Sequence, residues 1–90
     1  MKILYIRDKS LHFKKEGEKT LVLKKNKKEI VELNEVGSLI WDFLEKKKSK
    51  DSLVKEIASI YKTVDSLEIT KDVEEFLEQC SKDYLVKKVK

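Results

Sequence analysis

One segment joins an extended run directly to a helical one, and it reads Glu29-Ile30-Val31-Glu32-Leu33-Asn34-Glu35-Val36-Gly37-Ser38-Leu39-Ile40-Trp41-Asp42-Phe43-Leu44. Asn34 stands at the junction, and asparagine is a favoured helix N-cap because its side-chain oxygen accepts a hydrogen bond from a first-turn amide. From Val36 onward, apolar residues recur with the 3.6-residue period of one helix face. The segment predicts a strand that ends at Leu33 and a helix over residues 35–46. Gly37 inside that helix costs about 1 kcal/mol relative to alanine, so we expect another backbone to approach it closely.

Shorter extended segments precede this junction. Residues 11–15 alternate with period two, as half-buried strands do, and residues 20–24 are rich in strand-forming residues. Gly17 and Asn26 mark the turns, because both tolerate a left-handed backbone. Together with residues 28–33, these segments predict an antiparallel meander of three strands. The strand over residues 28–33 lies at an edge of that meander, so one side of its backbone is unpaired unless something covers it.

Helical patterns fill the second half of the chain. An amphipathic pattern covers residues 51–62, and another begins after Asp65, which forms a capping-box pattern with Glu68. A run of strands followed by a run of helices favours the α+β class: a three-stranded antiparallel sheet followed by a three-helix bundle. Residues 85–89 form either a last short strand or an extended tail. The apolar run at residues 3–6 pairs either within the chain or with a second copy, which leaves a homodimer open.

Size and composition limit the classes of function. The chain has 90 residues, no proline and two glycines, so we expect one domain over residues 1–90. The run at residues 3–6 is too short for a signal peptide or a membrane span, and a single cysteine excludes an internal disulfide. We therefore expect a cytoplasmic protein. The net charge is +4, yet residues 7–28 carry nine basic and three acidic residues, whereas residues 66–83 carry two basic and six acidic ones.

Several motifs, in this order and at this spacing, carry a resemblance to a known family. They are Glu32-Leu33-Asn34-Glu35-Val36-Gly37 followed by Ile40-Trp41, then Ile57 and Tyr61, and finally Asp72-Val73-Glu74-Glu75-Phe76-Leu77 ahead of Tyr84-Leu85-Val86. Over roughly residues 10–86 the chain resembles the PqqD-like family, small peptide chaperones named after the protein that assists pyrroloquinoline quinone synthesis. One departure is Lys82-Asp83-Tyr84, where the family usually carries a glycine before the final apolar pair.

The resemblance implies a winged-helix-like domain that binds the leader of a ribosomally made precursor peptide. The leader adds as a strand beside the third strand, lies against the third helix, and is handed to a modifying enzyme, often a radical S-adenosylmethionine enzyme. The resemblance implies neither catalysis nor a cofactor. Strand addition also follows from the vacant edge, since main-chain hydrogen bonds supply affinity and pockets supply specificity. The expected peptide-binding residues are Lys27, Lys28, Glu29, Ile30, Val31, Glu32, Leu33, Asp72, Val73, Phe76, Leu77 and Cys80.

Other interpretations of these residues stay open. The lysines at positions 24, 25, 27 and 28 either protect the edge against aggregation or steer an acidic leader toward it. Phe76 and Leu77 also suit a core, and Cys80 suits a small buried apolar residue, because no histidine or clustered metal ligand accompanies it. The rival function is DNA binding by a winged helix. The acidic third helix argues against that function, because a polyanion favours lysine and arginine.

Overall fold

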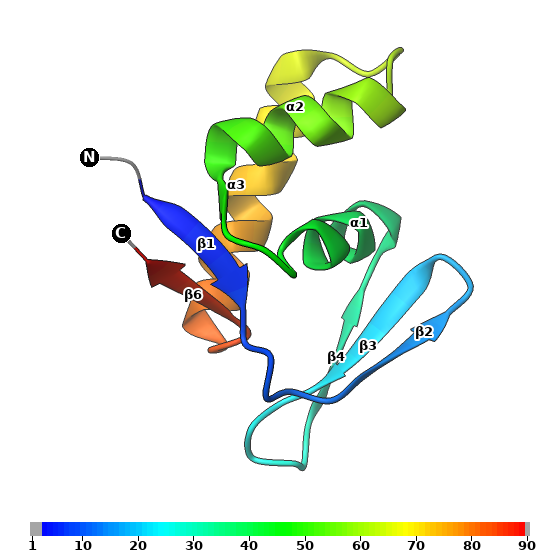
Figure 1. Ribbon diagram of the computed structural model, residues 1–90. Coiled ribbons are helices and arrows are strands. Elements are labelled where there is room, and N and C mark those ends of the chain that lie inside the picture. The colour runs from blue at the N-terminus through cyan, green and yellow to red at the C-terminus, as the bar shows by residue number, and fades with distance from the viewer. Residues whose placement is uncertain (1–2, 90) are drawn as a thin grey trace.

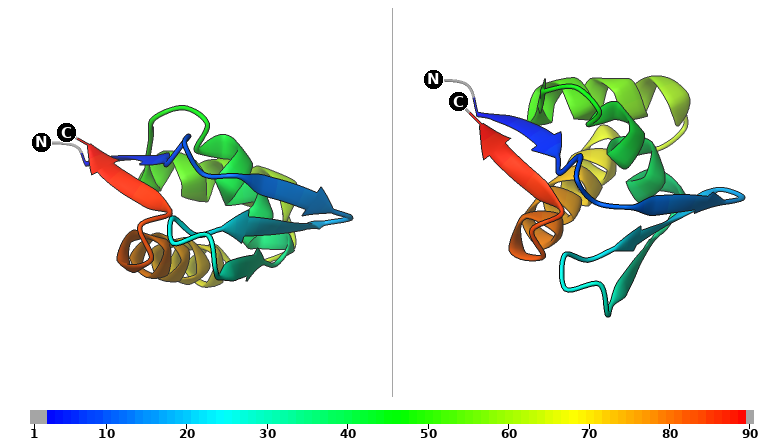
Figure 2. Two further views of the ribbon diagram at one scale, coloured as in Figure 1. Left: turned by 90° about the horizontal axis from the view of Figure 1, so that it is seen from below. Right: turned by 60° about the horizontal axis from the view of Figure 1, so that its bottom comes forward.

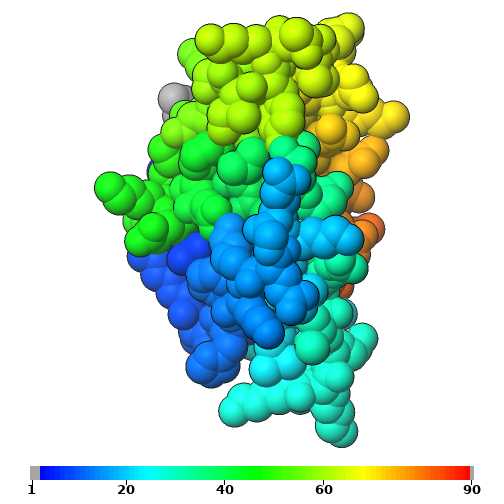
Figure 3. Space-filling model, turned by 90° about the vertical axis from the view of Figure 1, so that its right-hand side faces the viewer, coloured from blue at the N-terminus to red at the C-terminus, as the bar shows by residue number. Residues whose placement is uncertain are grey.

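The computed structural model describes residues 3–89, and its helices and strands follow the predicted order with additional strands at both ends and one between the first two helices. The elements are β1 (Leu4–Arg7), β2 (Phe13–Glu16), β3 (Lys19–Leu23), β4 (Ile30–Leu33), α1 (Glu35–Phe43), β5 (Lys48–Ser49), α2 (Lys50–Ile60), α3 (Ser66–Lys82) and β6 (Val86–Val89). The α+β class is confirmed, with a three-stranded antiparallel sheet and three helices. Figure 1 shows the three helices gathered together and the hairpin of β2 and β3 reaching away from the termini, and Figure 3 views the molecule from the side toward which that hairpin points.

The predicted meander is one of two sheets. In the first sheet the order is β2-β3-β4, and both pairs are antiparallel. In the second sheet the order is β5-β1-β6, so strands from the two ends of the chain lie side by side (Figures 1 and 2). The apolar run that begins at Ile3 therefore pairs within the chain, and β1 has a neighbour on each edge. Residues 86–89 form a strand rather than a loose tail.

Some predicted boundaries were wrong. The first helix ends at Phe43 instead of residue 46, because the chain turns there to place β5 beside β1. The strand β5 has no counterpart among the predicted elements, since a strand of two residues is too short to show a period in the sequence. The first strand of the meander begins at Phe13, and Leu11 before it belongs to the buried core.

The core lies between the helices and the two sheets. Trp41 of α1 is completely buried, and the ring of Phe13 meets its indole edge-on at a centroid distance of 5.7 Å. The guanidinium of Arg7 lies over both rings and donates a hydrogen bond to the Trp41 carbonyl. This stack ties β1, β2 and α1 together. Within residues 3–89, no helix has the length and apolar character that a bilayer crossing needs.

The end of α3 shows how this chain manages without the glycine that the family usually carries before the final apolar pair. Leu85 N–H donates to the Cys80 carbonyl and Tyr84 N–H donates to the Ser81 carbonyl, which is the hydrogen-bond pattern of a Schellman motif. Tyr84 occupies the left-handed position of that motif with φ of 60°, where glycine has no steric penalty. The chain therefore forms the Schellman motif with tyrosine, a residue less suited than glycine to a positive φ. The Tyr84 side chain is 75% exposed.

Candidate functional site

The outer edge of β4 is vacant within the described part of the chain. β4 pairs only with β3, and its partner residues include Val22 opposite Val31 and Leu23 opposite Ile30. Leu23 N–H donates to a carbonyl on the other side of β3, that of His12. Because antiparallel pairs alternate between bonded and non-bonded, Val31 bonds to β3 and Ile30 points its N–H and C=O outward. Two residues on, the backbone of Glu32 also points to the vacant edge.

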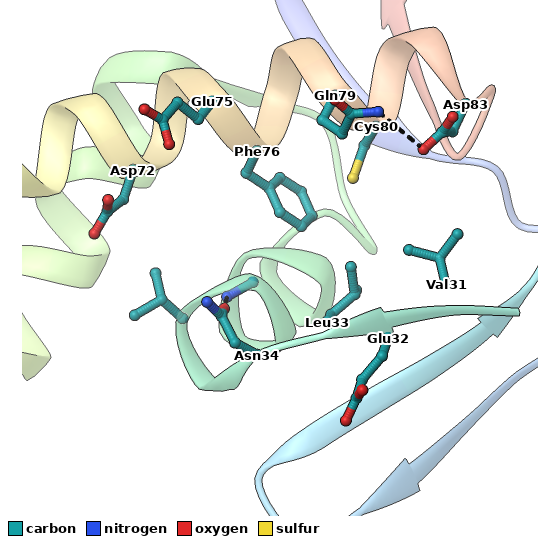
Figure 4. A pocket seen from close by; sticks show the side chains of 12 residues that line it. Val31, Glu32, Leu33, Asn34, Asp72, Glu75, Phe76, Gln79, Cys80 and Asp83 are labelled. Carbon is teal, nitrogen blue, oxygen red and sulfur yellow. Dashed lines mark hydrogen bonds between the residues drawn. The ribbon is translucent and has the colours of Figure 1, made fainter.

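A groove of about 320 Å³ runs beside this edge, between β4, the start of α1 and one side of α3. Figure 4 shows β4 and α3 alongside each other, with Phe76 between them. The lining residues are Val31, Glu32, Leu33, Asn34, Val36, Gly37, Asp72, Glu75, Phe76, Gln79, Cys80 and Asp83. The groove is therefore flanked by a strand that lacks a partner on one side.

The structure brings some of the predicted site residues together at the groove and places the others elsewhere. Half of the twelve predicted residues line the groove, and they are Val31, Glu32, Leu33, Asp72, Phe76 and Cys80. Val73 and Leu77 lie in the core with exposed fractions of 0% and 3%. Ile30 is 64% exposed and borders a separate apolar hollow with Leu21 and Leu23. Lys27, Lys28 and Glu29 precede β4 and do not line the groove.

Sequence reasoning missed half of the lining. The missed residues are Asn34, Val36, Gly37, Glu75, Gln79 and Asp83. On α3 the groove takes the positions spaced three and four residues apart from Asp72 to Asp83, one step around the helix from the apolar stripe. These polar positions form a stripe next to the apolar stripe of the helix, and that stripe is the sequence feature from which the groove side of α3 could have been predicted. At the start of α1, the N-cap itself forms part of the groove.

Gly37 has a different role from the predicted one. Its neighbour is a side chain and not a backbone: a Cβ at this position would lie 3.4 Å from the ring of Phe76 and 3.2 Å from Asn34 Oδ1. The Gly37 N–H donates to Asn34 Oδ1 at 2.8 Å, which is the predicted N-cap bond. The glycine therefore lets the Phe76 ring lie against the first turn of α1 and form the centre of the groove.

In the part of the chain that the structure describes, one of the carboxylates on the α3 side of the groove is paired with a lysine and two are not. Asp83 Oδ1 lies 3.6 Å from Lys24 Nζ, and Gln79 donates to Asp83 Oδ2 at 3.3 Å. Among residues 3–89, neither Asp72 nor Glu75 forms an ion pair within 4.0 Å. The groove therefore has an unneutralised acidic end.

Two of the four clustered lysines form ion pairs with carboxylates of the same chain. Lys24 pairs with Glu29 as well as with Asp83, and Lys25 Nζ lies 3.1 Å from Asp8 Oδ2. Asp8 is only 3% exposed. Hydrogen bonds from the Ser10 hydroxyl and amide, together with Lys25, lower the pKa of Asp8 to about 2 against the opposing effect of burial. Lys27 and Lys28 are therefore the lysines of the cluster that could protect the β4 edge or steer an acidic leader toward it.

Cys80 is a buried apolar residue, as predicted. Its side chain is 3% exposed, and burial raises the pKa of the thiol to about 12, with a further contribution from the charge of Asp83. A thiol with this pKa is protonated at neutral pH and is a poor nucleophile. Among the described residues, no group of three or more histidine, cysteine, aspartate or glutamate side chains is placed to hold a metal ion.

The fold and the groove define a class of small α+β domains in which a free strand edge borders an apolar groove. The chain belongs to the PqqD family: the family described as coenzyme PQQ synthesis protein D matches residues 19–86. This match confirms the resemblance seen in the sequence.

A solved structure with a similar fold is TbiB1 in complex with the TbiA(beta) leader peptide. The two share 23% sequence identity and superpose with a TM-score of 0.78 over 91% of this chain and 94% of that one. No curated protein matches the chain. At this identity, the structural similarity supports the fold.

Proposed function

We propose that this protein binds the leader segment of a ribosomally made precursor peptide as an added strand on β4. The vacant edge beside the groove carries this proposal, because main-chain bonds to Ile30 and Glu32 would hold the peptide while alternate side chains enter the groove. Membership of the PqqD family supports it, as does the similar fold of TbiB1, which was solved with a leader peptide.

The protein acts as a single non-catalytic domain that presents the bound peptide to a modifying enzyme. The family supports this role, and a radical S-adenosylmethionine enzyme is the partner that the family resemblance suggests. A presenting protein needs a second surface that remains free when the leader is bound. The sheet face opposite the groove supplies one, since Leu21, Leu23 and Ile30 form an apolar hollow there. Both partners would be met in the cytoplasm, where the precursor is synthesised.

An amide-resolved NMR titration tests leader binding. The probe is the precursor peptide encoded nearest to this protein's own gene, added to the whole chain. We expect shifts at Ile30, Glu32 and Gly37 and along the groove side of α3 from Asp72 to Asp83. Shifts confined to other parts of the protein, or their absence at saturating peptide, would count against strand addition of that peptide at this site.

DNA binding by a winged helix is the weaker candidate. The stripe of α3 that borders the groove carries three carboxylates, Asp72, Glu75 and Asp83. A polyanion approaching this face would be repelled, because nucleic-acid affinity depends on lysine and arginine contacts to phosphates. A gel shift with duplex DNA at low and moderate salt separates the two functions. We expect no salt-sensitive complex.

A further inference from the structure

The charges and apolar surface of the groove are arranged in order along its length. Figure 4 shows Asp72 and Glu75 at the end where β4 runs into Asn34, and Cys80 and Asp83 at the other end. Phe76 lies between the two ends. An extended peptide in this groove therefore meets an acidic end and an apolar centre at different positions of its own sequence.

No cation in the described part of the chain is paired with the acidic end of the groove. Asp72 and Glu75 are exposed, and neither takes part in an ion pair within residues 3–89, whereas Asp83 is paired with Lys24. These two carboxylates lie three residues apart on α3 at the same end of the groove, and together they attract a positively charged group from outside. A peptide with an acidic residue at this point would instead add a third negative charge.

The centre of the groove is apolar. Phe76 is half-buried, with its ring held against Gly37, and Val31, toward the Asp83 end of the groove, is also half-buried. Cys80 adds a protonated thiol. This combination suits a large aliphatic or aromatic side chain, which gains about 25 cal/mol for each Å² of apolar surface removed from water.

The spacing of an added strand links the centre to the acidic end. Residues of a guest strand opposite Val31 and Leu33 would point to the groove side, because cross-strand partners share a face. Successive groove-facing residues are then about 6.7 Å apart. On α3, Phe76 and Asp72 are four residues apart, which is about 6 Å along the helix axis. A guest residue two positions from the one over Phe76 therefore reaches the acidic end.

We infer that the leader recognised here carries a lysine or arginine two positions before a large apolar residue. The inference rests on the proposed function. The order of the two residues is that of a guest paired antiparallel to β4, as β3 is, since antiparallel pairs are the commoner kind; such a guest begins at the Asn34 end and runs toward Val31. The basic residue then comes first. The lysine cluster lies at the other end of the β4 edge, before Ile30. It could therefore attract acidic residues that follow the apolar residue in the leader.

Selection from a random library of displayed twelve-residue peptides tests this inference on the full chain. We expect enriched peptides to share a large apolar residue with lysine or arginine two positions before it. Exposed charge pairs are weak, so the preference for a basic over a neutral residue at that position should be about threefold to tenfold in affinity. It should decrease as salt is raised.

Two variants make the selection specific to the site. In Asp72→Asn with Glu75→Gln, the basic preference should disappear while the apolar residue is retained. The matched control is Glu68→Gln with Glu78→Gln, which also removes two carboxylates from α3 at positions outside the groove, and there the preference should persist. Circular dichroism melting verifies that both double variants fold, which is expected because each removes only exposed charges.

The outcomes separate this inference from the proposed function. Three results would overturn the inference and leave peptide binding intact. The enriched peptides could share the apolar residue but show no basic preference, they could carry an acidic residue at that position, or they could carry the basic residue after the apolar one. A basic preference that survives in Asp72→Asn with Glu75→Gln would also overturn it. Selection that enriches no peptide at all would instead overturn the proposed peptide binding at this groove.

Discussion

Replacing Ile30 by proline should abolish strand addition and leave the domain folded. Ile30 points its N–H away from β3, so proline removes no hydrogen bond of the sheet. Its side chain is 64% exposed, so little core packing is lost. A guest strand would lose the bond donated by Ile30, worth about 0.5–1.5 kcal/mol, and the proline ring would intrude where the guest lies about 4.8 Å away. We expect affinity to fall at least about tenfold, or 1.4 kcal/mol.

Neighbouring substitutions separate the backbone effect from other causes. Ile30→Ala truncates the same side chain and keeps the donor, so affinity should stay near that of the wild type. Val31→Pro removes a donor that the alternation assigns to the β3 ladder and leaves a buried carbonyl of Val22 unpaired. That change should destabilise the fold by about 1–3 kcal/mol, a large share of the 5–15 kcal/mol typical of a domain.

Affinity is measured by fluorescence anisotropy with a labelled peptide recovered from the library, and stability by urea unfolding. The argument requires Ile30→Pro to unfold at nearly the wild-type urea concentration and to bind poorly. Wild-type affinity in a folded Ile30→Pro protein would refute strand addition at this edge. Equal loss of affinity in Ile30→Ala would assign the effect to the side chain instead of the backbone.

The remaining predictions concern stability and reactivity. Tyr84→Gly should raise the unfolding free energy by about 1 kcal/mol because Tyr84 is held at φ of 60°, and Tyr84→Ala should give no such gain in the same urea titration. Asn34→Ala should lower the melting temperature by about 4–8 °C, since it removes an N-cap bond worth about 1 kcal/mol; Asn34→Asp, which keeps the acceptor, should melt close to the wild type. The pKa of Asp8 is lowered from 3.8 to about 2, so its stabilisation is complete above pH 4 and is lost as pH falls toward 2; in Asp8→Asn this part of the pH dependence of unfolding should be absent. Cys80 should resist iodoacetamide at pH 8 in the native protein and react after unfolding, and rapid native labelling would contradict its burial and raised pKa.

Local patterns predicted the elements that form the groove. The extended run before Asn34 and the 3.6-residue period after it place a strand end and a helix start within two residues of each other, and both are present. Strand order in a meander then leaves the β4 edge unpaired, as the structure shows for residues 3–89. These features depend on neighbours in the chain, which is why a single sequence reveals them.

The pairing of β1 with β5 and β6 could not be read in this way. Leu4 pairs with Val89 and Ser49, and no local pattern specifies partners so far apart in the chain. The same limit applies to the groove side of α3. The sequence shows which residues are apolar, but whether Val73 or Phe76 faces the groove depends on how α3 is rotated against α1 and β4, and packing of Val73 and Leu77 into the core sets that rotation.

The amino-acid order was thus sufficient for the strand and the helix, because strand-forming preferences and helix capping are local, whereas the vacancy of the β4 edge also required β1, β5 and β6 to pair with one another. Tertiary packing alone decided that Asp72 and Glu75 meet the end of β4 with no cation from the described residues paired to them, while Lys24 neutralises Asp83. Charges separated by tens of residues come together only when the core closes, so the electrostatic character of the groove is a property of the folded molecule.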